Sequence, residues 1–275
     1  MSQRKVTLSS AGLTSLFSGG STGTSPILTQ AASNLLAGMS TGTMLQGAQG
    51  THPDDISSNS ITVLVLGIDR SGSVKQYEDE IRQSYNDAIK EMKGSKEADN
   101  ILVSVYSFGQ GVTCIHAPLP LSQAHKLDTS NYVADDGYTD LYKCYIEMIG
   151  AGVAFFKQLI DESVANRLIT AIITDGDNNP YDRDPKWSAS NCAIINQPAK
   201  GMAEKQVNAF IGVGDAANFK AIANQMGITE VLENKARGAG QFRKIFRQLS
   251  KSTIQASATK IQASGQGMSS SYFVT

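Results

Sequence analysis

The chain of 275 residues is 41% hydrophobic and 18% charged, so it is long and apolar enough to bury a sizeable core. Lys and Arg together number 24 and Asp and Glu 25, which leaves no basic excess to displace counterions from nucleic-acid phosphates. No run approaches the roughly 18 consecutive apolar residues of a membrane span. We therefore expect a cytoplasmic, soluble protein that neither binds nucleic acid nor spans a membrane.

The N-terminal segment and the cysteines agree with this expectation. The apolar residues after Arg4 and Lys5 are broken by Ser, Thr and Gly before a signal-peptide core can form. Cys114, Cys144 and Cys192 are an odd number without C-x-x-C spacing, so neither a disulfide framework nor a zinc site is expected.

Residues 1–57 form the first compositional segment. Ser, Thr and Gly fill nearly half of its positions, and no acidic residue precedes Asp54. Such a segment buries too little apolar surface to offset the entropy that it loses on ordering. We expect a low-complexity tail that orders only through contacts outside itself.

Residues 58–250 alternate between buried-strand runs and amphipathic helices. This alternation predicts an α/β domain with a doubly wound, mainly parallel sheet flanked by helices. The run ITVLVLGI at 61–68 is apolar throughout, as a central parallel strand covered on both faces must be. Apolar residues then recur every three or four positions from 74 to 92 and predict a one-sided helix. Strands at 101–108 and 111–115, joined through Gly109 and Gln110, predict a hairpin at a sheet edge.

The second half of this domain repeats the alternation. A helix is expected at 140–160, where Gly150 and Gly152 indicate close packing against the sheet. Buried strands are expected at 167–174 and 208–214, a short edge strand at 228–232, and further helices at 218–226 and 240–250. Residues 251–275 return to Ser, Ala, Gln and Gly, with Lys251 and Lys260 as the only charges, and form a Ser-rich C-terminal tail.

Five oxygen-bearing side chains follow the ends of the predicted strands. Asp69, Ser71 and Ser73 form a D-x-S-x-S turn after the first strand, Thr139 precedes the helix at 140–160, and Asp175 ends the strand at 167–174. Loops at the carboxyl ends of neighbouring strands whose connections run in opposite directions form the ligand crevice of an open α/β sheet. Five hard oxygen donors without His or Cys favour Mg²⁺, Mn²⁺ or Ca²⁺ over zinc or copper. The spacing therefore predicts a divalent-cation site.

These residues resemble the metal-ion-dependent adhesion site of a von Willebrand factor A domain, and the resemblance covers roughly residues 60–250. The stretches 210–227 and 240–257 further resemble small bacterial A-domain proteins of the tellurite-resistance type. Arg70 stands where Thr is common, Val74 where Met is common, and Tyr138 replaces the second Gly before Thr139. None of these departures removes a ligand, although we expect Tyr138 to narrow the approach to the metal.

The resemblance implies that Ser71, Ser73 and Thr139 bind the ion directly or nearly so, and that Asp69 and Asp175 contribute directly or through water. It leaves one coordination position for a carboxylate from a partner protein. Asp135, Asp136, Asp140, Asp177, Asp182 and Asp184 in the neighbouring loops are interpreted as solvated loop charges.

Three functions remain open. The leading hypothesis is a Mg²⁺-dependent protein-interaction module, a cytosolic scaffold or assembly subunit in a bacterial stress or defence system. The second is phosphoryl hydrolysis, but no second Asp completes a D-x-D motif and no His, Lys or Cys in the motif loops offers a general acid or base, so no enzyme is expected.

The third hypothesis is a self-assembling structural subunit, a homo-oligomer or filament whose tails cross between copies. The N-terminal anchors onto neighbouring copies would be Leu13, Leu16, Phe17, Ile27, Leu28, Leu35, Leu36, Met39, Met44 and Leu45. Tyr272, Phe273 and Val274 would dock as a short strand or plug.

Overall fold

The computed structural model describes residues 4–17, 27–135, 137–199, 202–235, 240–259 and 271–273. Within these residues, six strands form one sheet of order β3-β2-β1-β4-β5-β6. The strands are β1 (Ile61–Asp69), β2 (Ile101–Gly109), β3 (Gly111–Pro120), β4 (Ala165–Thr174), β5 (Gln206–Val213) and β6 (Glu230–Asn234). Only β3, at one edge, runs antiparallel to its neighbour. The predicted doubly wound, mainly parallel α/β fold is confirmed.

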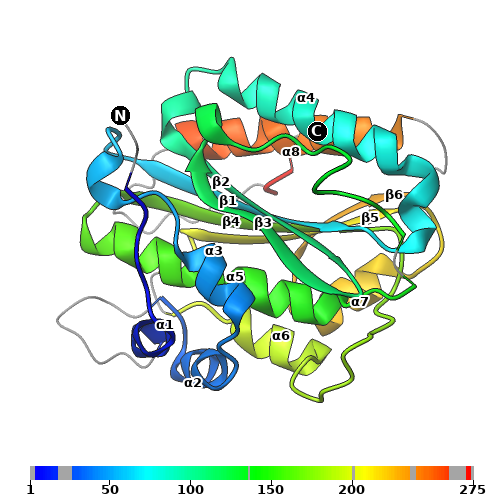
Figure 1. Cartoon of the computed structure of the whole chain (residues 1–275), viewed down its shortest axis with the longest axis horizontal. Coiled ribbons are helices and arrows are strands. Elements are labelled where there is room, and N and C mark those ends of the chain that lie inside the picture. Colours follow the sequence, from blue (N-terminus) through cyan, green and yellow to red (C-terminus); the bar gives the residue numbers. More distant parts are fainter. Residues whose placement is uncertain are drawn as a thin grey trace.

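Helices cover both faces of the sheet (Figure 1). On one face lie α4 (Glu78–Lys93) and α8 (Gln241–Ala258), which share an apolar cluster with Leu64, Leu66 and Ile68 of β1. The other face carries α5 (Leu141–Asp161), α6 (Ala189–Ile195) and α7 (Phe219–Gln225), and it buries Val63 and Val65. Successive β1 side chains therefore enter different cores, which explains why this strand is apolar throughout.

The predicted elements are present with small shifts. The helix expected at 74–92 begins with a 3₁₀ segment, Gly72–Tyr77, and becomes α-helical at Glu78. The hairpin of β2 and β3 lies at the sheet edge, as expected, and β6 forms the opposite edge. Helix α6 has no counterpart in the sequence interpretation because its seven residues span barely two turns.

The N-terminal segment departs from the expected tail. Within its described residues, α1 (Ser10–Phe17), α2 (Gln30–Gly38) and α3 (Gly42–Ala48) pack on the outer side of α5 (Figure 1). The hydroxyls of Thr29 and Thr41 accept hydrogen bonds from the backbone of Ala32 and Met44 and so cap the starts of α2 and α3. Some of the Thr residues that gave the segment its low-complexity composition are therefore helix caps.

The apolar residues that were expected to anchor the N-terminal segment on neighbouring copies pack within their own chain instead. Leu13, Phe17, Ile27, Leu28, Leu36, Met39 and Met44 are buried in the α5 cluster, and Leu16, Leu35 and Leu45 pack against it. The reason is visible in α5, where every residue from Cys144 to Phe156 is buried. A helix that is buried all round needs cover on the side away from the sheet, and the N-terminal helices supply it.

Gly150 of α5 illustrates this outer layer of N-terminal helices. A methyl group on Gly152 would lie 3.2 Å from Val65 of the sheet, as expected, whereas one on Gly150 would lie 3.0 Å from Met44 of α3. The prediction that both glycines face the sheet is therefore correct for Gly152 and wrong for Gly150.

The C-terminal segment also packs on the core where it is described. Helix α8 continues to Ala258, eight residues beyond its expected end, because Ala256 is still buried in the apolar cluster that α8 shares with α4 and β1. Tyr272 and Phe273 are buried in that cluster, and the Tyr272 hydroxyl lies 2.9 Å from Thr253 Oγ1. Among the described residues, the expected boundaries at 57/58 and 250/251 do not separate a packed domain from unpacked tails. Val274, the third residue of the expected C-terminal plug, lies outside the described residues.

None of the helices in the described part of the chain combines the length and apolarity that crossing a membrane requires.

Candidate functional site

The reversal of strand order places the site between β1 and β4. From β1 the chain continues through α4 to β2, and from β4 it continues through α6 to β5 on the opposite side. The two strands pair in parallel, so their carboxyl ends meet at the same edge of the sheet. Asp69 is the last residue of β1, and Asp175 directly follows β4. This is where an open α/β sheet forms its ligand crevice.

Four of the five predicted ligands form one chain of hydrogen-bonding contacts. The Ser71 amide donates to Asp69 Oδ1 at 2.8 Å, the hydroxyls of Ser71 and Ser73 lie 2.9 Å apart, and the Ser73 hydroxyl donates to Asp175 Oδ1 at 2.7 Å. Two carboxylates and two hydroxyls that are up to 106 positions apart in sequence therefore converge at one point.

Thr139, the fifth predicted ligand, is tied to the same loops through its backbone. Its amide donates to the Asn179 carbonyl at 2.8 Å, and the Asn179 amide returns a bond of 3.1 Å. Thr139 is buried. Its bridge partner, Asn179, lies on the loop after β4, four residues beyond Asp175.

Asp140 holds these loops in place. Its carboxylate accepts hydrogen bonds from the amides of Gly111 at 2.8 Å, Tyr181 at 2.7 Å and Asp182 at 3.2 Å, and the residue is 1% exposed. The interpretation of Asp140 as a solvated loop charge is therefore wrong. It joins the β2–β3 turn, the start of α5 and the loop after β4, and sequence reasoning missed this role because all three amides are remote in sequence.

Asp69 lies in an environment that disfavours an isolated negative charge. The residue is 2% exposed, and burial raises the pKa of its carboxyl to about 6, although hydrogen bonds from Ser71 and Thr174 act in the opposite direction. The Thr174 hydroxyl donates to Asp69 Oδ2 at 2.6 Å.

The donor set fits a hard divalent cation. Asp69 and Asp175 offer carboxylate oxygens, and Ser71 and Ser73 offer neutral hydroxyls. The two hydroxyls lie within hydrogen-bonding distance of each other, and the Ser73 hydroxyl also reaches Asp175. Among the described residues, no group of three or more His, Cys, Asp or Glu side chains could hold a metal ion, so a ligand set at this position would have to include the serine hydroxyls.

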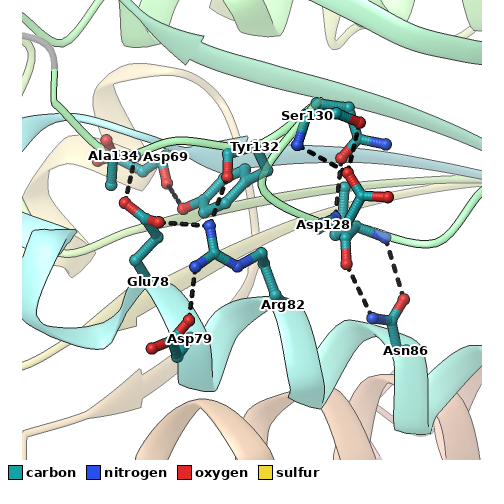
Figure 2. A network of polar contacts seen from close by, with 11 residues as sticks. Asp69, Glu78, Asp79, Arg82, Asn86, Asp128, Ser130, Tyr132 and Ala134 are labelled. Atoms are coloured by element: carbon teal, nitrogen blue, oxygen red, sulfur yellow. Dashed lines mark hydrogen bonds and ion pairs between the residues drawn. The ribbon is translucent and has the colours of Figure 1, made fainter.

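A polar network braces the end of β1 against α4 (Figure 2). The Tyr132 hydroxyl donates to the backbone carbonyl of Asp69, and Arg82 of α4 donates to the Tyr132 carbonyl at 2.8 Å. Arg82 also pairs with Glu78, which accepts a 2.8 Å hydrogen bond from the Ala134 amide. Sequence reasoning missed Tyr132 and Arg82, because a loop tyrosine and a polar helix residue carry no periodic signal.

Tyr138, which directly precedes Thr139, packs against Tyr181 of the loop after β4. The rings of Tyr138 and Tyr181 meet edge to face with centroids 5.1 Å apart, and Tyr181 is 55% exposed. The residue that departs from the adhesion-site pattern at position 138 is thus half-buried and packs against an exposed tyrosine.

No protein-family model and no curated protein sequence matches the chain. Similar solved structures include the PilB minor pilin from Streptococcus sanguinis, with 15% identity and a TM-score of 0.51, covering 74% of this chain and 64% of that one. The pilus adhesin SpaC from Lactobacillus rhamnosus GG has 14% identity and a TM-score of 0.50 over 72% of this chain and 30% of the adhesin. They also include a von Willebrand factor type A protein from Catenulispora acidiphila, with 14% identity, a TM-score of 0.45, and coverage of 71% and 43%.

At these identities the likeness to the two pilus proteins shows a shared fold. The chain spans less than two thirds of the length of either protein.

Proposed function

We propose that this protein is a divalent-metal-dependent protein-interaction module of the von Willebrand factor A type. Asp69, Ser71, Ser73, Thr139 and Asp175 would hold Mg²⁺, or Mn²⁺ or Ca²⁺ in its place, and a partner protein would supply an acidic residue to the ion. The observation that carries the proposal is the contact chain that runs from Asp69 to the Ser71 amide and then through the hydroxyls of Ser71 and Ser73 to Asp175.

The carboxylates and the hydroxyls would have different roles in such a site. Two carboxylates balance the charge of a divalent cation, while neutral hydroxyls leave it electrophilic enough to attract a further carboxylate. Thr174 and the Ser71 amide orient the Asp69 carboxylate, and Asp175 orients the Ser73 hydroxyl. A partner carboxylate should bind only with the cation, because two aspartates alone would repel it.

We also propose that the module has no catalytic activity of its own. No His, Lys or Cys in the motif loops offers a separate general acid or base, and no second Asp completes a D-x-D motif. Metal-dependent phosphatase, nuclease or nucleotidase activity that disappears in Ser71→Ala would support the hydrolase alternative instead.

From the sequence resemblance to tellurite-resistance A-domain proteins we infer a cytosolic scaffold in a bacterial stress or defence assembly. Three free, buried thiols agree with a reducing compartment. The alternative of tail exchange between copies loses its motivation, since the described apolar anchors pack on their own chain.

Metal-dependent stabilisation tests the proposal. Ligand that binds the native state at about 100 times its Kd adds roughly 2.7 kcal/mol to the free energy of unfolding. We expect millimolar Mg²⁺ or Mn²⁺ to raise the Tm of metal-free protein, and Asp69→Ala and Asp175→Ala to remove this response.

Asp177→Ala is the matched control, because Asp177 is exposed and lies two residues beyond Asp175. It should respond to metal like the unmodified protein. An unchanged Tm of the metal-free, unmodified protein on addition of either ion would contradict the proposal.

A further inference from the structure

A pocket opens directly beside the candidate metal ligands. Its volume is about 260 Å³, and Ser73 and Asp175 form part of its wall. Tyr77, Val213, Ala216 and Phe242 supply much of the remaining wall. Sites for drug-sized ligands range from about 300 to 1,000 Å³, so this pocket suits a single large side chain rather than a whole metabolite.

The apolar wall belongs to the core on the α4 and α8 face of the sheet. Phe242 is buried in the first turn of α8, and its ring lies 5.5 Å from the ring of Tyr77, which ends the 3₁₀ segment after the serine turn. Val213 ends β5, and it is buried. Gly176 and Gly214 also line the pocket and add no side chains to fill it. The pocket thus exists because packed residues surround two positions without side chains.

The pocket joins two kinds of chemistry at one opening. Ser73 and Asp175 belong to the group that would hold a cation and hence attract a carboxylate, while Tyr77 and Phe242 present aromatic rings. Aromatic side chains gain contact energy from tilted ring pairs as well as from burial. A group that carries both a carboxylate and an aromatic ring can therefore satisfy both parts of the wall.

We propose that the pocket receives an aromatic side chain that lies next to the metal-binding acidic residue of the partner protein. This inference rests on the proposed function of the metal site. It makes the pocket a specificity determinant: the ion recognises the acidic residue, and the pocket selects acidic residues that have an aromatic neighbour.

Two small carboxylates test the proposal on the full-length protein. Propionate offers only the carboxylate, and 3-phenylpropionate adds one phenyl ring. Chemical-shift titrations of ¹⁵N-labelled protein in saturating Mg²⁺ should give a Kd for 3-phenylpropionate that is at least tenfold lower than that for propionate.

Variants at the pocket locate the effect. Ala216 is exposed on the wall, so Ala216→Phe should fill the pocket and remove the tenfold preference while propionate still binds. Ala216→Ser, which leaves the pocket open, should keep the preference. Gln76→Phe, at another exposed wall position, provides a second filling variant if Ala216→Phe lowers the Tm.

The outcomes separate the two proposals. Metal-dependent binding of both carboxylates with equal Kd would overturn the pocket inference and leave the metal site standing. Binding of 3-phenylpropionate that is unchanged by EDTA and lost in Ala216→Phe would support the pocket and contradict the metal-dependent function. Retention of the preference in both filling variants would also overturn the pocket inference.

Discussion

The backbone carbonyl of Asp69 accepts a hydrogen bond from the Tyr132 hydroxyl, and this contact connects the candidate metal site to α4 through Arg82. Tyr132 is fully buried, so its hydroxyl would have no water partner if Asp69 moved. The tyrosine therefore holds the end of β1 without being a ligand.

Tyr132→Phe removes this hydrogen bond and leaves the Asp69 carbonyl without its buried donor. We expect a loss of about 1 to 3 kcal/mol in the free energy of unfolding and a weaker apparent affinity for Mg²⁺. Chemical denaturation with and without Mg²⁺ measures both. Tyr181→Phe is the control, because Tyr181 is exposed; an equal effect of the two substitutions would contradict a positioning role for Tyr132.

Glu147 is a second residue whose environment the sequence did not reveal. It lies on α5, is 1% exposed, and its Oε2 has no hydrogen-bond partner among the described residues. Burial raises its pKa to about 7, against smaller opposing effects of Lys143 and the hydroxyls of Thr41 and Thr43, and Asp140 raises it further. The folded protein therefore retains a proton on Glu147 that the unfolded chain releases near pH 4.5.

A raised folded-state pKa stabilises the protein fully below pH 4.5, and this contribution is lost as pH rises to about 7. Each pKa unit corresponds to about 1.4 kcal/mol, so about 3 kcal/mol is at stake. We expect Glu147→Gln to remove this loss and make the variant more stable than the unmodified protein at pH 8. Denaturation at pH 5 and pH 8 measures the free energy of unfolding of both proteins. Glu162→Gln is the control, because Glu162 is exposed. If the stability of the unmodified protein and of Glu147→Gln changed in parallel with pH, the raised pKa of Glu147 would be contradicted.

At the scale of elements, α3 packs on α5 as part of the outer layer formed by the N-terminal helices. A methyl group at Gly47 of α3 would lie 1.6 Å from the buried Tyr106 hydroxyl and 2.9 Å from Ala151 of α5. By contrast, a methyl group at Gly42, the first residue of the same helix, would meet nothing within 4 Å. The two glycines of α3 thus differ in packing while sharing a helix.

Gly47→Ala should destabilise the protein by about 1 to 3 kcal/mol or more, because a well-packed core must shift to admit the methyl group. Gly42→Ala should change stability little, or raise it slightly through better helix propensity. Thermal unfolding of the two variants checks this pair. Equal Tm values would mean that α3 does not pack against β2 and α5 as described.

At the scale of the whole molecule, the N-terminal helices decide which fragment can fold. Removal of residues 1–57 would uncover the outer side of α5, where Gly150 faces Met44 and Leu36. Ending the chain at residue 250 would also delete the last eight residues of α8. A fragment of residues 58–250 would therefore expose apolar surface that the full chain buries.

We expect the full-length protein to remain monomeric in light scattering at high micromolar concentration with Mg²⁺, since its described apolar anchors are satisfied within the chain. The 58–250 fragment should aggregate or bind a hydrophobic dye. A fragment of residues 4–275, which keeps every described element, is the control. Large particles formed by the full-length protein, together with a monomeric 58–250 fragment, would instead support tail exchange.

The sequence by itself determined the order of the core elements and the position of the candidate site. Both follow from local patterns: apolar runs mark the buried strands, and a strand end followed by Asp69 or Asp175 marks the carboxyl edge of a parallel sheet. Apart from Glu147, residues 144–156 are apolar or glycine, and this run is a signal that the sequence interpretation did not use: a helix facing only the sheet would be polar on its other side.

The tertiary structure alone decided which residues meet across long sequence separations. Tyr132 bonds a carbonyl 63 positions away, α1 to α3 cover a helix about a hundred residues further along the chain, and the pocket combines Tyr77, Val213 and Phe242. No local period predicts such contacts, because their free energy comes from burial that exists only once the sheet and helices are assembled.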